Sequence, residues 1–216
     1  MSSRSYTPLV AYMKWHHSLA VVFLVVLLCS CSRKSDTMLS GVNILPVGTS
    51  VEQGLSVYYR YVFYRHLNQM ASESVMLTEG EKGQPVPMLD HQFEGNVYDS
   101  KRAKGVAVFL TGLIRMESSG TYRFKAMSND GIQVAVNGEV VVFDPAIHGD
   151  RFSKIGAISV AGPGWYPLTV KYFQRKGTAR LTLYWQPPGA KDFEVVPAGV
   201  YGHQLLPFEE KKERGV

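Results

Sequence analysis

Cysteine is almost absent from this chain of 216 residues, and its two cysteines, Cys29 and Cys31, both lie near the N-terminus. The rest of the sequence therefore has no pair of thiols that could form a disulfide, even in an oxidising compartment. Apolar residues make up 45% of the chain, which is enough for one domain of ordinary size to build its own core. We therefore expect a single domain that is stabilised by packing and not by cross-links.

The sequence also lacks the short motifs of common enzyme families. It contains no Gly-x-Ser-x-Gly, no His-Glu-x-x-His and no glycine loop for phosphate. No cysteine after residue 31 is available as a nucleophile, and no pair of carboxylates stands out as a glycosidase pair. We therefore expect that the protein is not an enzyme and has no catalytic residues.

A hydrophobic run long enough to span a bilayer is missing as well. The longest run, residues 19–28, has about ten apolar residues, whereas a membrane-spanning helix needs about 20. Arg4 and Lys14 precede this run and no acid accompanies them. This pattern predicts an export signal helix over residues 1–30. The signal begins at either Met1 or Met13, because Met13-Lys14 would also give a basic start.

The end of this leader, Leu28-Cys29-Ser30-Cys31, resembles the lipobox of bacterial lipoproteins. The resemblance implies cleavage after Ser30 and acylation of Cys31, which becomes the mature N-terminus. Ser32 at the next position implies sorting to the outer membrane, on its periplasmic or its surface face. The alternative is an ordinary signal peptide that happens to contain two cysteines.

Charge of one sign is not in large excess. Removal of the leader takes away two basic residues and no acid, so the formal net charge falls from +5 to +3. This near balance argues against nucleic acid as a partner. Small and polar residues without a sustained period predict a flexible tether over residues 31–50, and residues 207–216 form a charged tail of mixed sign.

The region between tether and tail, residues 51–206, has the pattern of an all-β domain. Aromatic and β-branched residues predict a first strand from residue 51 to about Val62. Glycines and prolines interrupt residues 71–104, where we expect irregular chain with one or two short strands. Residues 106–110 read as a buried strand, and residues 113–116 either continue it or pair beside it.

The second half of this domain alternates clearly. Tyr122, Phe124 and Ala126 alternate with basic residues, as in a strand with one buried face. Asn137-Gly138 is the typical dipeptide of a two-residue hairpin turn, which predicts a return strand over residues 139–143. Residues 155–160, 165–173 and 179–185 supply three more strands. The sequence thus predicts an antiparallel β-sandwich or barrel that follows a signal helix and a flexible tether.

The order of these segments resembles the PA-14 domain family. The resemblance covers residues 51–206, and no single fragment of it is decisive. Its motifs are Gly54-Leu55 with Tyr58-Tyr59, Gly120 with Tyr122 and Phe124, Asn129-Asp130-Gly131, Asn137-Gly138, Trp165-Tyr166 with Leu168 and Tyr172, and Leu181 with Leu183 and Trp185.

The resemblance implies a β-sandwich module that often binds carbohydrate. In the members that bind sugar, two adjacent aspartates hold a Ca²⁺ ion that bridges sugar hydroxyls, and oxygen ligands of this kind suit calcium. Here the first aspartate is replaced by Asn129, so Asp130 would need help from another acid. Asp144 and Asp150 are the candidates. The alternative is that Asn129-Asp130-Gly131 is only a turn, because these residue types favour turns in any case.

Two functions follow from these expectations. The first is a lipid-anchored module that binds a glycan or envelope polysaccharide at Asn129, Asp130, Asp144 and Asp150, with Trp165 as the candidate ring that stacks on a sugar. The second is a structural or assembly lipoprotein that docks an envelope protein on the outer membrane without sugar or calcium.

Overall fold

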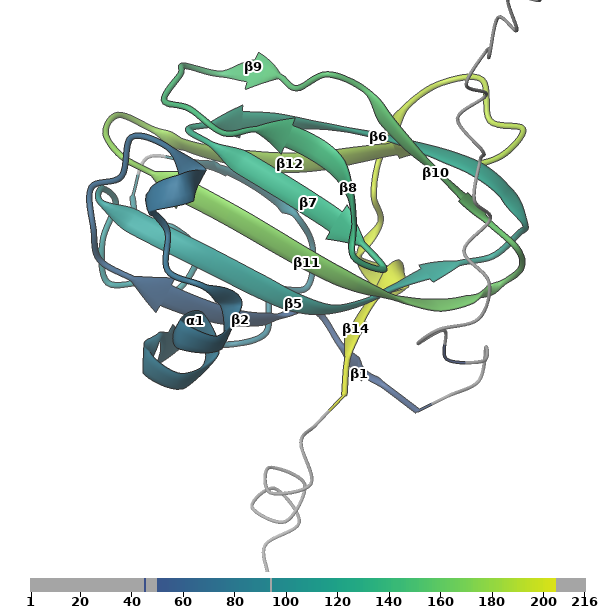
Figure 1. Ribbon diagram of the computed structural model, residues 1–216, viewed down its shortest axis with the longest axis horizontal. Helices are drawn as coiled ribbons and strands as arrows, with labels where there is room; N and C mark the ends of the chain where they lie inside the picture. Colours follow the sequence, from purple (N-terminus) through teal and green to yellow (C-terminus); the bar gives the residue numbers. More distant parts are fainter. Residues whose placement is uncertain (1–44, 46–49, 94, 205–216) are drawn as a thin grey trace, which may run out of the picture. The chain divides into compact units, whose positions relative to one another are not determined.

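The computed structural model describes residue 45, residues 50–93 and residues 95–204, which form two stacked antiparallel sheets (Figure 1). The predicted all-β fold is therefore confirmed. The predicted signal peptide, Cys31, most of the tether and the charged tail lie outside the described residues.

The larger sheet is built around two long strands that pair along their whole length. These are β5 (Val106–Met116) and β11 (Gly164–Gln174). They are antiparallel, so Gly164 pairs with Met116 at one end and Gln174 pairs with Val106 at the other. The order β1-β14-β5-β11-β7-β8 describes the sheet, with β2 beside β5 and β3 beside β2. The other members are β1 (Glu52–Gln53), β2 (Ser56–Arg60), β3 (Glu81–Lys82), β7 (Ile132–Val136), β8 (Glu139–Asp144) and β14 (Tyr201–His203).

The smaller sheet is centred on β6 (Gly120–Asn129) and β12 (Ala179–Gln186), in the order β10-β6-β12-β13. Two further strands lie at its edges, where β4 pairs with β12 and β9 pairs with β6. These outer strands are β4 (Asp90–Phe93), β9 (Arg151–Phe152), β10 (Gly156–Val160) and β13 (Glu194–Val195).

The alternation expected from the sequence fixes which side chains fill the space between the sheets. Phe124, Ala126 and Leu183 of the smaller sheet and Val134 and Val170 of the larger one are fully buried in one core cluster. The hairpin turn is also as predicted, because Asn137 and Gly138 have φ values of 49° and 81°. Positive φ at both central residues is what a type I′ turn requires.

The N-terminal part departs from the prediction in two places. The first strand is split at Gly54, which has φ of +88° and lies against the backbone of Val86, and the second piece ends at Arg60 and not near Val62. The region 71–104 contains the two short strands expected there, but also a seven-residue helix, α1 (Glu73–Glu79), capped by Ser72. Two 3-10 turns, η1 (Leu67–Gln69) and η2 (Ala198–Val200), complete the described elements.

Residues 113–116 were expected either to continue the preceding strand or to pair beside it. They continue the strand that begins at Val106. In residues 50–93 and 95–204, no helix has the length and apolar character needed to cross a membrane.

Candidate functional site

Three loops meet at one end of the sandwich, and Asp130 connects them. Asp130 follows β6, and its Oδ1 accepts a hydrogen bond from the backbone N–H of His148 at 3.0 Å. Its Oδ2 accepts one from the backbone N–H of Arg175, just after β11, at 2.8 Å. The residue is only 5% exposed. Asp130 therefore holds the β8–β9 and β11–β12 connections to the end of β6 and lies beneath the surface.

Asn129 precedes Asp130 through a cis peptide bond and has different partners. Its Nδ2 donates to Oδ1 of Asp150 at 2.9 Å, and Oδ2 of Asp150 lies 3.6 Å from the Arg180 guanidinium. The backbone oxygen of Asn129 accepts a hydrogen bond from the Tyr172 hydroxyl at 2.5 Å. Burial raises the pKa of that phenol, so the hydroxyl stays protonated as a donor. The structure thus brings Asn129 and Asp150 together, as the candidate set requires.

Asp144, at the end of β8, forms a separate pair with Arg151. Two guanidinium nitrogens of Arg151 contact its two oxygens at 2.8 and 2.6 Å, and His148 Nε2 lies 3.4 Å away. Burial raises the pKa of the carboxyl, but the hydrogen bonds from Arg151 and the charges of His148 and Arg151 outweigh it, so the pKa lies below its ordinary value. Asp144 is thus held ionised by its own neighbours.

These partners decide how well the residues suit a calcium ion. Carboxylate and amide oxygens are the right ligand type. However, both oxygens of Asp130 accept backbone N–H groups, both oxygens of Asp144 contact Arg151, and Asp150 lies between Asn129 and Arg180. Among the described residues, no group of three or more acidic, His or Cys side chains could hold a metal ion. In this arrangement, the oxygen atoms of Asp130, Asp144 and Asp150 do not fit a calcium ion.

Trp165 does not have the exposure that a sugar-stacking ring needs. Its side chain is 6% exposed, and the Arg115 guanidinium lies 5.9 Å from the centre of its ring. The expectation for this residue was wrong because Trp165 is buried where it lies, between Arg115 of β5 and the backbone of Leu45.

A surface hollow of about 660 Å³ lies beside Asp144 and Arg151. Two aromatic residues line it, Phe143 of β8 and Phe152 of β9, and they are 54% and 47% exposed. The remaining lining residues are Val140, Val141, Pro145, Lys154, Ile155 and Gly156. Sequence reasoning missed the two rings. In β8 a register shift opposite Val134 and Ala135 interrupts the alternation, so that Val141 and Val142 are both buried while Phe143 is exposed.

The comparisons with known proteins agree with this fold. Residues 94–199 match the PA14 domain family model. No curated protein matches the sequence. Among solved structures, a PA14 sugar-binding domain from an RTX adhesin matches with a TM-score of 0.51 and 18% identity, over 70% of this chain and 99% of that one.

Two further structures share the fold. The epithelial adhesin 9 A domain of Candida glabrata, solved with Galβ1-4GlcNAc, matches with a TM-score of 0.54 and 12% identity, over 75% of this chain and 94% of that one. An anti-sigma factor domain-containing protein matches with a TM-score of 0.58 and 19% identity, over 72% of this chain. This chain spans about half of that protein, 49% of its length.

Proposed function

Because residues 94–199 place this chain in the PA14 domain family, we propose that it is a carbohydrate-binding module of the bacterial cell envelope. Two solved domains of the same fold support the proposal, one described as a sugar-binding domain and one solved with a disaccharide. The observation that carries it in this chain is the hollow at the sandwich end, where two half-exposed aromatic rings lie beside a fixed acid–base pair.

The chemistry of this hollow suits a sugar. The faces of Phe143 and Phe152 can pack against the C–H face of a pyranose ring. Asp144 and Arg151 supply one acceptor and one donor group that are held in place by their mutual hydrogen bonds. A few fixed polar groups in a largely apolar hollow are typical of small-molecule sites. The ring that stacks on the sugar is then Phe143 or Phe152, in place of Trp165.

We expect this binding to be independent of calcium. Each carboxylate of the candidate set already has a protein partner, and Asn129 brings no negative charge of its own. Asp130 then shapes the loops that border the hollow and does not contact the sugar.

A glycan array with the purified domain tests the proposal. We expect hits with uncharged glycans that persist in the presence of a chelator and disappear for Phe143→Ala. Phe63→Ala is the matched control, because Phe63 is 55% exposed, close to the 54% of Phe143, and does not line the hollow. An array without hits, or hits that survive Phe143→Ala and Phe152→Ala together, would contradict the proposal. Capture of one envelope protein in place of a glycan would favour the docking function.

The location of the module is a separate part of the proposal. A lipid on Cys31 would anchor the domain to the outer membrane through the tether of residues 31–50. Cys31→Ser should then release the protein from the membrane fraction or stall its processing. A Cys31→Ser protein that still fractionates with the outer membrane would exclude this anchor.

A further inference from the structure

Three aromatic rings surround the ammonium group of Lys125 on the outer face of the smaller sheet. The Lys125 Nζ lies 4.3 Å from the ring centre of Phe152, 4.6 Å from that of Phe193 and 5.8 Å from that of Tyr184. The rings come from β9, from the segment before β13 and from β12. Ring faces attract a cation at such distances and fix its position.

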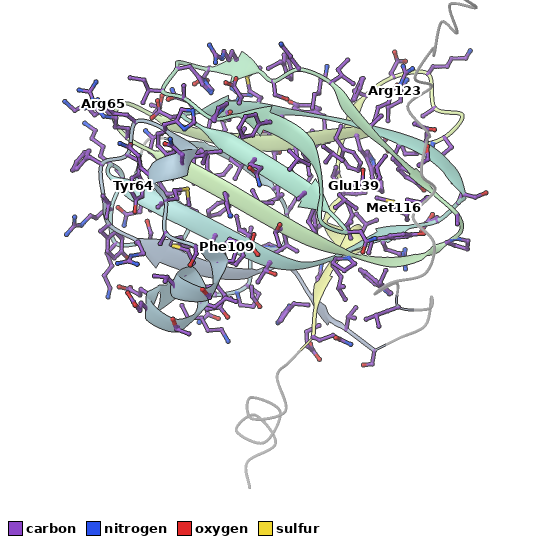
Figure 2. The ribbon with its side chains drawn as sticks, viewed as in Figure 1. Tyr64, Arg65, Phe109, Met116, Arg123 and Glu139 are labelled. Carbon is purple, nitrogen blue, oxygen red and sulfur yellow. The ribbon has the colours of Figure 1, made fainter. Side chains whose placement is uncertain are left out.

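The positive charge of this group has no neutralising acid among the residues that the structure describes. In the part of the chain that the structure describes, no carboxylate forms an ion pair with Lys125 or with Arg123, the next outward-facing residue of β6. Figure 2 marks the position of Arg123 beside β6 and β10. Alternate residues of a strand share a face, so the Cα atoms of Arg123 and Lys125 lie about 7 Å apart and their side chains project from one surface.

A second hollow adjoins the Arg123 end of this surface. It has a volume of about 420 Å³ and is lined by Thr121, Arg123, Gln186 and the turn of residues 187–190. Gln186 is paired with Arg123 across the strands, and its amide nitrogen is held by the carbonyls of Ala190 and Lys191. The surface therefore combines two cations without a counter-charge, three ring faces, a hydroxyl and a fixed amide.

We propose that this outer face, formed by Arg123, Lys125, Phe152, Tyr184 and Phe193, is a second glycan site that binds acidic polysaccharide with carboxylate-bearing sugars. The carboxylates pair with Arg123 and Lys125, while the three rings, whose faces contact the Lys125 ammonium, hold that cation in position. The near-balanced charge of the whole chain favours this ligand over nucleic acid, which needs a broad basic surface. Because the rings restrain Lys125, its side chain loses little conformational freedom on binding, which favours affinity.

This site does not depend on the function proposed for the end of the sandwich. Phe152 borders both surfaces, but Lys125, Arg123 and Phe193 do not line the hollow beside Asp144. Phe143→Ala therefore separates the two proposals, since it should leave the binding of acidic sugar unchanged.

The test compares oligogalacturonate with its methyl ester, because the two differ in charge and share the same sugar. Titration calorimetry in calcium-free buffer should detect binding of the acid and not of the ester. Lys125→Met and Arg123→Gln should each weaken it about fivefold, as for a partly exposed ion pair, and the double variant about twentyfold or more. Lys104→Met, an exposed cation outside this surface, should have no effect.

Three results would overturn the proposal. They are no binding of the acid, equal binding of the acid and the ester, and full affinity in the double variant. The thermal midpoint of each variant is measured alongside, and Arg123→Gln keeps the test valid if Lys125→Met unfolds, because Arg123 is exposed.

Discussion

The C-terminal end and the outer face of β6 carry polar groups of opposite character. At the C-terminal end, Asn129 and Asp130 have partners from the β8–β9 and β11–β12 loops, and the acids nearby are paired with arginines. On its outer face, Arg123 and Lys125 have no acidic partner among the described residues. The difference shows that an acidic loop is no proof of a ligand site, since internal partners compete for the same oxygens. Charged side chains that have no partner within the fold are a better guide to a ligand site.

The strongest expected effect concerns Asp130. Asp130→Ala leaves two part-buried backbone N–H groups, of His148 and Arg175, without their acceptor. Because each such group costs roughly 1–3 kcal/mol, we expect the free energy of unfolding to fall by about 3 kcal/mol in urea denaturation. Asp150→Ala is the control and should cost less than about 1 kcal/mol, because its ion pair is partly exposed. Equal losses for both variants would mean that Asp130 does not hold the loops together.

A smaller effect on the free energy of unfolding should appear at acidic pH. The folded state lowers the pKa of Asp144 below its ordinary 3.8, so the pair with Arg151 stabilises the protein above that value. This contribution is lost as the pH falls through the lower pKa of the folded state, because protons then bind the native carboxyl too. We expect Asp144→Asn to remove about 1 kcal/mol at pH 7 and little at pH 2. A loss that is the same at both pH values would exclude this ion pair as its source.

The charge of Lys125, on the outer face of the smaller sheet, should contribute little to stability. Lys125→Met keeps the aliphatic stem and removes the charge, so the free energy of unfolding should change by less than about 1 kcal/mol. Thermal and urea unfolding of this variant and Lys104→Met measure it. A loss of several kcal/mol would show that the rings around Lys125 serve the fold and not a ligand.

The smallest effect is expected from calcium. An ion that binds only the native state must raise the thermal midpoint. Because the carboxylates at the end of the sandwich are already paired, millimolar calcium should leave the midpoint unchanged, and chelation should do the same. A rise that disappears in Asp150→Ala would restore the calcium site that the resemblance implied.

The strands of the second half could be predicted because each repeats a simple local rule. Tyr122, Phe124 and Ala126 alternate with charge, and Asn137-Gly138 demands a tight turn, so neither depends on distant residues. The split at Gly54 and the helix at Glu73 were missed because a contact with Val86 and packing against β2 decide them.

The candidate site was harder to predict for the same reason. Asn129 and Asp150 were placed together correctly, but the sequence does not reveal that Arg151 and Arg180 pair with the neighbouring acids. The burial of Trp165 and the exposure of Phe143 depend on whether a strand is central or at an edge, which only the sheet order decides. Lys125 and the three rings around it come from three strands and a loop, so no local sequence motif predicts their contact.

The pairing of β5 with β11 has a consequence for how the molecule forms. The whole of β6 to β10 lies between these two strands in the chain, so their pairing is non-local and should be slow, whereas the β7–β8 hairpin can close within microseconds. Asp130 binds the backbone immediately after β11, and this bond must wait for that strand to arrive. The end of the sandwich is therefore completed late, and a nascent chain that stops before residue 175 would lack the Arg175 partner of Asp130 and the Arg180 partner of Asp150.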